Sequence, residues 1–211
     1  MKPVPNYSLY LVTDSFLAGP RGVEAVVQAA VAGGVTIVQW RDKDGDRRAL
    51  LPRVEYLREW LRLRNVPFIV NDDVELALAC DADGVHVGQG DLPCAEVRRR
   101  VGSEMLIGVS VGSVAEALQA ARDGADYLGV SPVFATPTKP DAPAATGLDG
   151  LRAIRAAVKL PLVAIGGIHA GNAAEVMTAG ADGIAVVSAI MTAADPRAAA
   201  LALCAATRRK Q

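Results

Sequence analysis

Gly180-Ala181-Asp182-Gly183-Ile184 is the stretch that decides the fold, because two similar stretches precede it in the chain. They are Asp81-Ala82-Asp83-Gly84-Val85 and Gly124-Ala125-Asp126-Tyr127-Leu128. In each one a helical pattern ends at a small turn, Ala-Asp follows, and an apolar run begins. These stretches indicate an internal repeat of helices and strands, and we expect them to lie at the floor of the fold with a structural role only.

Short apolar runs alternate with longer segments of helical periodicity along the whole chain. Because the runs are continuously apolar, they are typical of parallel strands that are covered on both faces. The predicted strands are residues 9–13, 35–39, 68–70, 84–87, 106–109, 127–130, 162–165 and 184–187. Eight strand–helix units in 211 residues predict an α/β fold, a (β/α)8 TIM barrel that forms one domain over residues 1–211. A doubly wound open sheet is the alternative.

The segments between the strands have the spacing of amphipathic helices. One apolar face comprises Val23, Val26, Val27, Ala30 and Val31. A second comprises Leu50, Val54, Leu57 and Leu61. Ser113 with Glu116 three residues later predicts a capping box at a helix start, and Pro93 fits the first turn of another helix.

Composition excludes several classes of protein. Apolar residues make up 51% of the chain and charged residues 21%, which gives a sizeable core and excludes a disordered chain. Lys and Arg number 22 against 23 Asp and Glu, so the net charge of −1 provides no basic field for nucleic acid or an anionic membrane. Three cysteines without a C-x-x-C pair, and no long apolar stretch, lead us to expect a soluble, cytoplasmic protein.

Polar or glycine-rich residues follow seven successive predicted strands. In such barrels the loops after the strands build the reactive face, so these residues should gather at one mouth. The clusters are residues 39–43, 71–73, 88–91, 110, 136–139, 166–168 and 187–190.

The chemistry of these clusters predicts phosphate ligands. Gly166-Gly167 and Ser188-Ala189 leave backbone N–H groups able to face an anion, although a tight turn alone is the alternative for the glycines. The cations Arg41, Lys43 and Lys139 predict a second anion site on the other side of the mouth.

Asp72 and Asp91 follow neighbouring predicted strands, so their carboxylates could share one hard cation. Two carboxylates with substrate phosphates are a usual arrangement for Mg²⁺. A helix N-cap is the alternative role for Asp72, and a turn ahead of Pro93 is the alternative for Asp91. We expect His86 to be a packed, hydrogen-bonded core residue and His169 to be solvated.

Taken together, these segments resemble the thiamine phosphate synthase family. The resemblance covers essentially the whole chain and rests on the segments 38–43, 70–72, 83–93, 108–110, 136–139 and 165–168, taken in that order. It implies a TIM-barrel transferase of thiamine biosynthesis that uses Mg²⁺. The implied reaction condenses 4-amino-2-methyl-5-hydroxymethylpyrimidine diphosphate with a thiazole phosphate, carboxylated or plain, and gives thiamine phosphate and diphosphate by dissociative loss of diphosphate.

The resemblance also implies a role for each matching residue. The pyrimidine diphosphate would be held by Gln39, Arg41, Lys43, Asn71, Ser110 and Lys139. Of these, the catalytic set would be Arg41, Lys43, Ser110 and Lys139. Magnesium would be bound by Asp72 and Asp91. The thiazole phosphate would be held by Thr136, Thr138, Gly167, Val187 and Ser188.

Two positions depart from the family pattern. Gly112 stands where many members carry His, and Ser131 stands where Gly is frequent. A thiazole tautomerase and a non-catalytic phosphate-ligand sensor on the same barrel are the alternative functions. The partners we expect are small-molecule substrates, with no nucleic acid and no membrane, and the formation of a homo-oligomer is left open. Residues 140–146 have the composition of a mobile lid.

Overall fold

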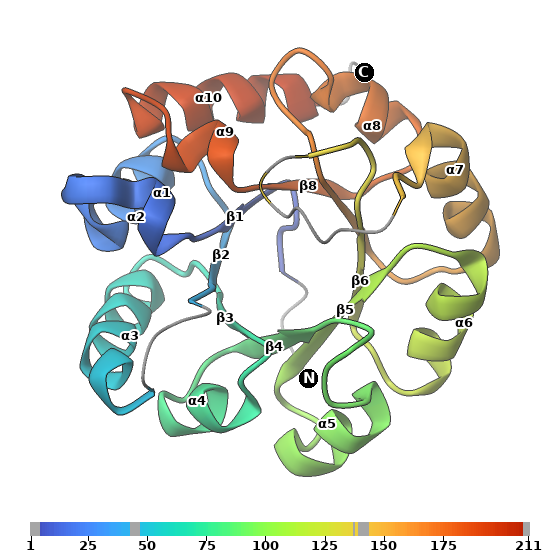
Figure 1. Ribbon diagram of the computed structural model, residues 1–211, viewed down its shortest axis with the longest axis horizontal. Helices are drawn as coiled ribbons and strands as arrows, with labels where there is room; N and C mark the ends of the chain where they lie inside the picture. Colours follow the sequence, from blue (N-terminus) through green and yellow to red (C-terminus); the bar gives the residue numbers. More distant parts are fainter. Residues whose placement is uncertain (1–4, 43–46, 137, 139–143, 209–211) are drawn as a thin grey trace.

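The computed structural model describes residues 5–42, 47–136, 138 and 144–208. Parallel strands form one closed barrel in the order β1-β2-β3-β4-β5-β6-β7-β8 (Figure 1). The strands are β1 Leu9–Val12, β2 Ile37–Trp40, β3 Phe68–Asn71, β4 Gly84–Val87, β5 Leu106–Val111, β6 Tyr127–Val130, β7 Leu162–Ile165 and β8 Gly183–Val186. Because β8 pairs in parallel with β1, the predicted barrel is confirmed and the open doubly wound sheet is wrong.

Helices surround the barrel on its outside (Figure 1). They are α1 Ser15–Ala18, the 3-10 turn η1 Gly19–Arg21, α2 Val23–Ala32, α3 Arg47–Arg62, α4 Val74–Ala79, α5 Cys94–Val101, α6 Val114–Arg122, α7 Gly147–Ala157, α8 Ala173–Thr178, α9 Ser188–Met191 and α10 Pro196–Thr207. None of the helices in the described part of the chain combines the length and apolar character of a membrane span.

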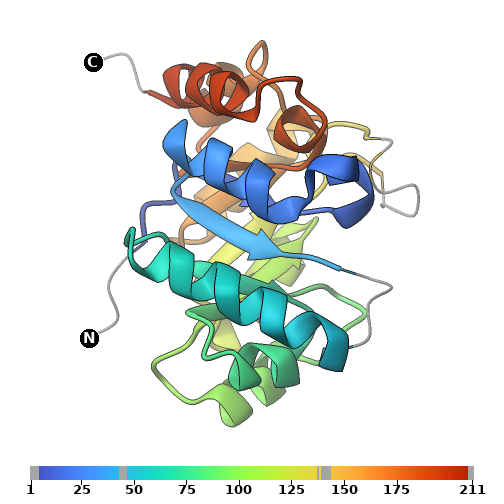
Figure 2. The same ribbon diagram turned by 90° about the vertical axis from the view of Figure 1, so that its left-hand side faces the viewer.

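The periodic apolar residues face the barrel as predicted. On α2 and α3 the buried members of the two sets are Val23, Val26, Val27, Ala30, Leu50, Val54, Leu57 and Leu61. The last helix, α10, lies beside α2 (Figures 1 and 2). Gly33 permits this approach, because a Cβ there would lie 2.4 Å from the carbonyl oxygen of Arg197.

The barrel has two apolar layers. The larger one lies between the strands and the helices. The smaller one fills the barrel interior and comprises Tyr7, Tyr10, Val12, Ile37, Ile69, Leu106, Tyr127, Val163 and Ala185. Since alternate residues of a strand point to opposite faces, Tyr10 and Val12 of β1 enter the interior while Leu9 and Leu11 pack under the helices.

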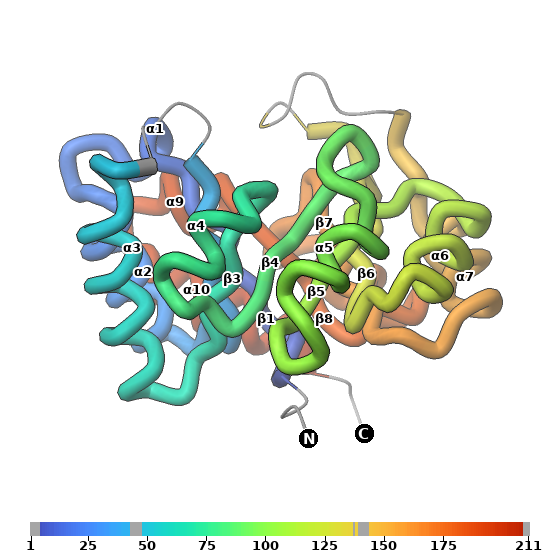
Figure 3. Tube along the Cα trace, turned by 90° about the horizontal axis from the view of Figure 1, so that it is seen from below, coloured from blue at the N-terminus to red at the C-terminus, as the bar shows by residue number. Residues whose placement is uncertain are grey.

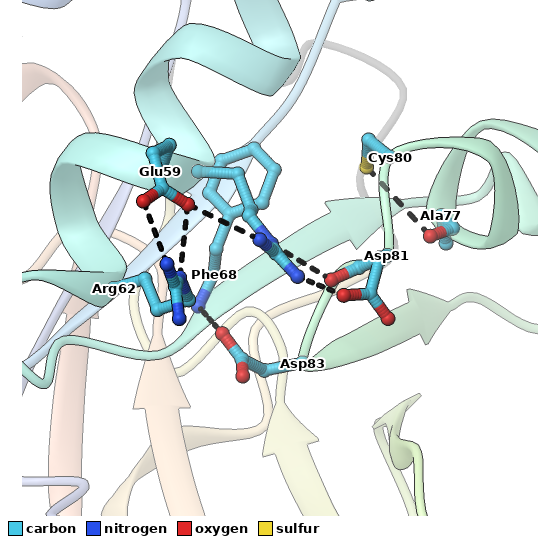
Figure 4. Close-up of polar contacts among 8 residues, drawn as sticks. Glu59, Arg62, Phe68, Ala77, Cys80, Asp81 and Asp83 are labelled. Atoms are coloured by element: carbon cyan, nitrogen blue, oxygen red, sulfur yellow. Dashed lines mark hydrogen bonds and ion pairs between the residues drawn. The ribbon is translucent and has the colours of Figure 1, made fainter.

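The three Ala-Asp stretches have the structural role that the sequence predicted. In each one the Asp carboxylate accepts the backbone N–H of a residue at the start of the preceding strand. The pairs are Asp83 with Phe68 at 2.8 Å, Asp126 with Ile107 at 2.8 Å and Asp182 with Leu162 at 2.9 Å. Figure 4 shows the first pair. We call these contacts the floor bridges, since they tie strand to strand at the amino ends of β3 and β4, β5 and β6, and β7 and β8.

Several predicted boundaries differ from the observed ones. Strand β2 begins at Ile37 rather than at residue 35, because Val35 and Thr36 form the connection from α2, in which Thr36 N–H donates to the carbonyl oxygen of Leu9 at 2.8 Å. Strand β5 continues to Val111. Pro93 is the N-cap of α5 and not part of its first turn.

The capping box at the start of α6 is present. The Ser113 hydroxyl accepts Glu116 N–H at 3.2 Å, and the Glu116 carboxylate accepts Gly112 N–H at 2.7 Å. At the opposite edge from the floor bridges, α1 and the segment 131–136 lie at the same, upper side of the barrel in Figure 3. This is the edge at which the predicted site residues gather.

Candidate active site

The predicted site residues that the structure describes all line one cavity, of about 370 Å³, at the carboxyl ends of the strands. These residues are Gln39, Arg41, Asn71, Asp72, Asp91, Ser110, Thr136, Thr138, Gly167, Val187 and Ser188. Lys43 and Lys139 lie outside the described residues. The barrel therefore brings together side chains from β2 through β8 that are far apart in the sequence.

Asp72 and Asp91 meet on one side of the cavity. Asp72 follows β3 with a left-handed backbone (φ +62°), an unusual conformation that Asp tolerates better than most residues, and its N–H donates to the carbonyl oxygen of His86 at 2.8 Å. Reduced hydration and the adjacent Asp91 carboxyl raise the pKa of Asp72 to about 6. The N-cap of α4 is Asp73, whose carboxylate accepts Leu76 N–H, so the alternative role for Asp72 is wrong.

Asp91 has the turn role that the sequence offered as an alternative. Its Oδ2 accepts Gly88 N–H at 2.7 Å, which closes a turn ahead of Pro93. Its carboxyl also contacts that of Asp72. The two carboxyl groups are in contact, and a backbone amide fixes one of them. They could serve as oxygen ligands for one divalent cation, whose remaining ligands would be water and phosphate. Among the described residues, no group of three His, Cys, Asp or Glu side chains could hold a metal alone.

The glycine turn after β7 lies on the opposite side of the closed barrel. Gly166 and Gly167 have φ values of +104° and +64°, which favour glycine. A Cβ on Gly167 would lie 2.8 Å from the carbonyl oxygen of Ala135, so the loop after β6 also requires glycine here. The tight-turn alternative thus describes the local backbone correctly, and this turn also lines the cavity.

Three hydroxyl side chains lie near this turn. Thr138 N–H donates to the Thr136 hydroxyl at 3.3 Å, and the Thr138 hydroxyl donates to the Ser188 hydroxyl at 3.4 Å. Ser188 opens α9 directly after Val187, so the first backbone amides of this helix have no acceptor inside it. Hydroxyls and backbone amides together can bind phosphate oxygens without a charged side chain.

A chain of hydrogen bonds crosses the barrel interior beneath the cavity. Gln39 Nε2 donates to the Tyr10 hydroxyl at 2.8 Å, and the hydroxyls of Tyr10 and Tyr127 are 2.9 Å apart. Tyr127 Oη lies 3.1 Å from His86 Nδ1, and His86 Nε2 lies 2.9 Å from Ser110 Oγ. Burial lowers the pKa of His86 to about 4, so the imidazole is neutral at pH 7. His86 is the packed, hydrogen-bonded residue that was predicted, and His169 is exposed.

The sequence analysis did not predict two groups of residues that lie at or beneath this cavity. Tyr10 and Tyr127 read as ordinary core residues of apolar strands, and no sequence signal marks their hydroxyls. Asp14 lies 3.4 Å from the Arg41 guanidinium, and Arg41 N–H donates to the Thr13 hydroxyl at 3.0 Å. The end of the first strand carries the same polar signal as the other seven, so extending the rule to it would have found Thr13 and Asp14.

The two departures from the family pattern lie differently. Ser131 lines the cavity, whereas Gly112 donates its N–H to Glu116 at the start of α6. Ser131 is therefore the departure that touches the space available to a ligand.

Comparisons with known proteins agree on one family. The family model described as thiamine monophosphate synthase matches residues 9–190. A thiamine-phosphate synthase from Chloroflexus aurantiacus is 57% identical over 93% of this chain and 91% of its own length. One from Albidiferax ferrireducens is 52% identical over 92% of this chain and 89% of its own length.

Solved structures extend the comparison. A thiamine phosphate pyrophosphorylase from Pyrococcus furiosus superposes with a TM-score of 0.88 at 42% identity, and the match covers 96% of each chain. A 3-hexulose-6-phosphate synthase, 19% identical with a TM-score of 0.71, shares the fold. The resemblance seen in the sequence motifs is confirmed, and the chain belongs to the thiamine monophosphate synthase family.

Proposed function

We propose that this chain joins 4-amino-2-methyl-5-hydroxymethylpyrimidine diphosphate to a thiazole phosphate, releasing diphosphate and forming thiamine phosphate. As a member of its family the chain is a transferase of thiamine biosynthesis. The observation that carries the assignment of residues is the single cavity lined by a carboxylate pair on one side and by a glycine turn with hydroxyls on the other.

The carboxylate side suits the pyrimidine diphosphate. Asp72 and Asp91 would hold Mg²⁺, which neutralises the leaving diphosphate when bound. Arg41 presents a guanidinium that can bind phosphate oxygens through two N–H groups, while Asp14 holds it at the wall of the cavity. Lys43 and Lys139 would place two further positive charges beside the departing diphosphate and help to neutralise it. We expect such electrostatic stabilisation to supply several kcal/mol of the rate enhancement, on the order of 3 for each well-placed group.

The same side would hold the pyrimidine ring. Gln39, Asn71 and Ser110 offer amide and hydroxyl groups to ring nitrogens and to the exocyclic amine. The aminopyrimidine can delocalise the positive charge left on its methylene carbon, so bond cleavage to diphosphate needs no protein nucleophile. A rate that stayed unchanged with electron-withdrawing groups on the pyrimidine would contradict this dissociative route.

The hydroxyl side would anchor the second substrate. Thr136, Thr138 and Ser188, with backbone amides at Gly167 and Val187, would hold the thiazole phosphate. This anchor places the thiazole nitrogen near the methylene carbon, and proximity supplies much of the remaining acceleration. Because this phosphate does not react, its contacts serve binding and orientation.

One assay tests the proposal. The purified protein is mixed with both substrates and Mg²⁺, and thiamine phosphate and diphosphate are quantified together. We expect equal amounts of the two products, and no product when either substrate is omitted or EDTA is added. Isomerisation of the thiazole without the pyrimidine would favour a tautomerase, and binding of both ligands without turnover would favour a sensor.

We further propose a cytoplasmic location. Both substrates carry phosphate groups, which do not cross an apolar bilayer unaided, so the enzyme must share the compartment in which they are made. Cell fractionation followed by the thiamine phosphate assay would contradict this location if the activity appeared outside the cytoplasmic fraction.

A further inference from the structure

The hydrogen-bond chain from Gln39 to Ser110 has groups that leave few choices for each proton. A phenol and an alcohol each have one proton to donate, and a neutral imidazole has one donor and one acceptor nitrogen. Tyr10 and Tyr127 are each 1% exposed, so water does not supply partners for their hydroxyls. The direction of every bond in the chain therefore depends on the direction of its neighbour.

Gln39 sets the direction at one end. Its Nε2 donates to the Tyr10 hydroxyl, so the Tyr10 hydroxyl donates to its other partner, the Tyr127 hydroxyl. The Tyr127 proton then goes to His86 Nδ1, which must be the acceptor nitrogen. The His86 proton consequently lies on Nε2 and is donated to Ser110 Oγ.

The reverse direction would leave a buried donor without a partner. If Ser110 donated to His86 and Tyr127 donated to Tyr10, the Tyr10 hydroxyl would receive two protons and have no acceptor for its own. Burying such an unsatisfied donor disfavours the reversed chain by about tenfold or more in population.

Two glycines show that the barrel interior is shaped around His86 and Tyr127. A Cβ on Gly108 would lie 2.2 Å from Tyr127 Cζ and 2.4 Å from His86 Nδ1, and a Cβ on Gly129 would lie 2.9 Å from His86 Cε1. Both glycines are on strands, β5 and β6, in which any larger residue would displace the pair. The contact between the two rings is thus built into the backbone.

We infer that Tyr10 and Tyr127 are positioning residues, which hold His86 in its Nε2–H form so that the Ser110 hydroxyl always donates its own proton into the cavity. The substrate atom that receives the Ser110 hydrogen bond is then an acceptor, such as a ring nitrogen or a diphosphate oxygen. This inference rests on the proposed function for the identity of the substrate, but its proton directions do not.

The first test is ¹⁵N NMR of the His86 ring in the ligand-free protein, in which couplings to the ring carbon-bound protons identify the protonated nitrogen. We expect the proton on Nε2. In Tyr127→Phe the Nδ1 resonance should move toward that of an acceptor without a hydrogen bond. Tyr7→Phe is the matched control, because the Tyr7 ring packs on Tyr127 with centroids 5.1 Å apart but Tyr7 takes no part in the chain from Gln39 to Ser110. A proton on Nδ1 in the unmodified protein would overturn the inference.

The second test is a double-mutant cycle in steady-state kinetics. Tyr127→Phe should lower kcat/KM for the pyrimidine diphosphate about fivefold, the loss of one hydrogen bond, with KM for the thiazole phosphate unchanged. In the Ser110→Ala background the same substitution should have no further effect, because the hydroxyl it orients is gone. A full fivefold effect in that background would mean that Tyr127 acts through packing, and would refute the positioning role.

The two tests separate this inference from the proposed function. The NMR measurement needs no turnover, so a protein that made no thiamine phosphate would contradict the proposed function and leave the proton directions testable. Conversely, an active protein with the proton on Nδ1 would keep its function and lose the inference.

Discussion

The free energy of unfolding should depend on pH through His86, and the size of the effect follows from its burial. The barrel interior lowers the pKa of His86 from its usual 6.5 to about 4. Each pKa unit corresponds to about 1.4 kcal/mol. The difference between the folded and unfolded pKa of His86 therefore changes the free energy of unfolding by about 3 kcal/mol. The unfolded chain binds the second imidazole proton of His86 more tightly than the folded protein does. The contribution of neutral His86 to the free energy of unfolding is therefore complete above pH 6.5 and is lost as the pH falls through about 4.

The measurement compares unmodified protein with His86→Gln by urea unfolding from about pH 7 to about pH 4. Glutamine retains polar atoms but does not titrate. The difference in unfolding free energy between the two proteins should change by as much as about 3 kcal/mol over this range, with the unmodified protein losing more. His169→Gln controls for the loss of a histidine from the exposed surface.

Asp72 acts in the opposite direction within the same window. Its pKa is raised to about 6, so its contribution to stability is present at low pH and is lost as the pH rises through 6. Both proteins carry Asp72, so this contribution cancels in the difference. If the two stability curves were parallel from pH 7 to 4, the buried, neutral state of His86 would be refuted.

Four further outcomes test the site and the fold. Asp72→Asn and Asp91→Asn should each abolish turnover at low Mg²⁺ and weaken Mg²⁺ binding in calorimetry; activity retained at low Mg²⁺ would end the shared-cation assignment. Ser188→Ala should raise KM for the thiazole phosphate by about fivefold with kcat unchanged, and a change confined to the pyrimidine KM would contradict the two-sided map. Lys139→Ala should lower kcat by roughly two to four orders of magnitude. Single-turnover rates equal to those of the unmodified protein would contradict a role for Lys139 in the departure of diphosphate. Asp182→Ala should lower the free energy of unfolding by about 1–3 kcal/mol in urea titrations, and an unchanged midpoint would show that its floor bridge is unimportant.

The barrel itself was predictable because its signals are local. Continuous apolar runs mark strands that are covered on both faces, and the Ala-Asp stretches mark where helices return to strands. The edges of strands were less predictable, since they depend on register against a neighbour. Strand β2 begins at Ile37 because that residue pairs with Tyr10 of β1, and no residue near Val35 announces this.

Residues of the candidate site were predictable where polar residues follow strands. They were unpredictable where a residue within an apolar strand has a polar group at the end of its side chain, as tyrosine does. Asn71 and Asp72 stand out at a strand end, but Tyr10 and Tyr127 lie within strands 117 residues apart. Their hydroxyls find each other only after the barrel closes. A prediction from sequence can place both tyrosines in the core, but it has no local reason to pair them.

The floor bridges bear on the order in which the barrel assembles. Each bridge joins residues only 15, 19 or 20 positions apart, within one strand–helix–strand unit. Loops of this length close at low entropic cost, so each pair of strands can form before the ring is complete. The barrel is then expected to grow from three preassembled units, with the β1–β8 seam closing last, and pulsed hydrogen exchange would contradict this order if the amides of that seam were protected first.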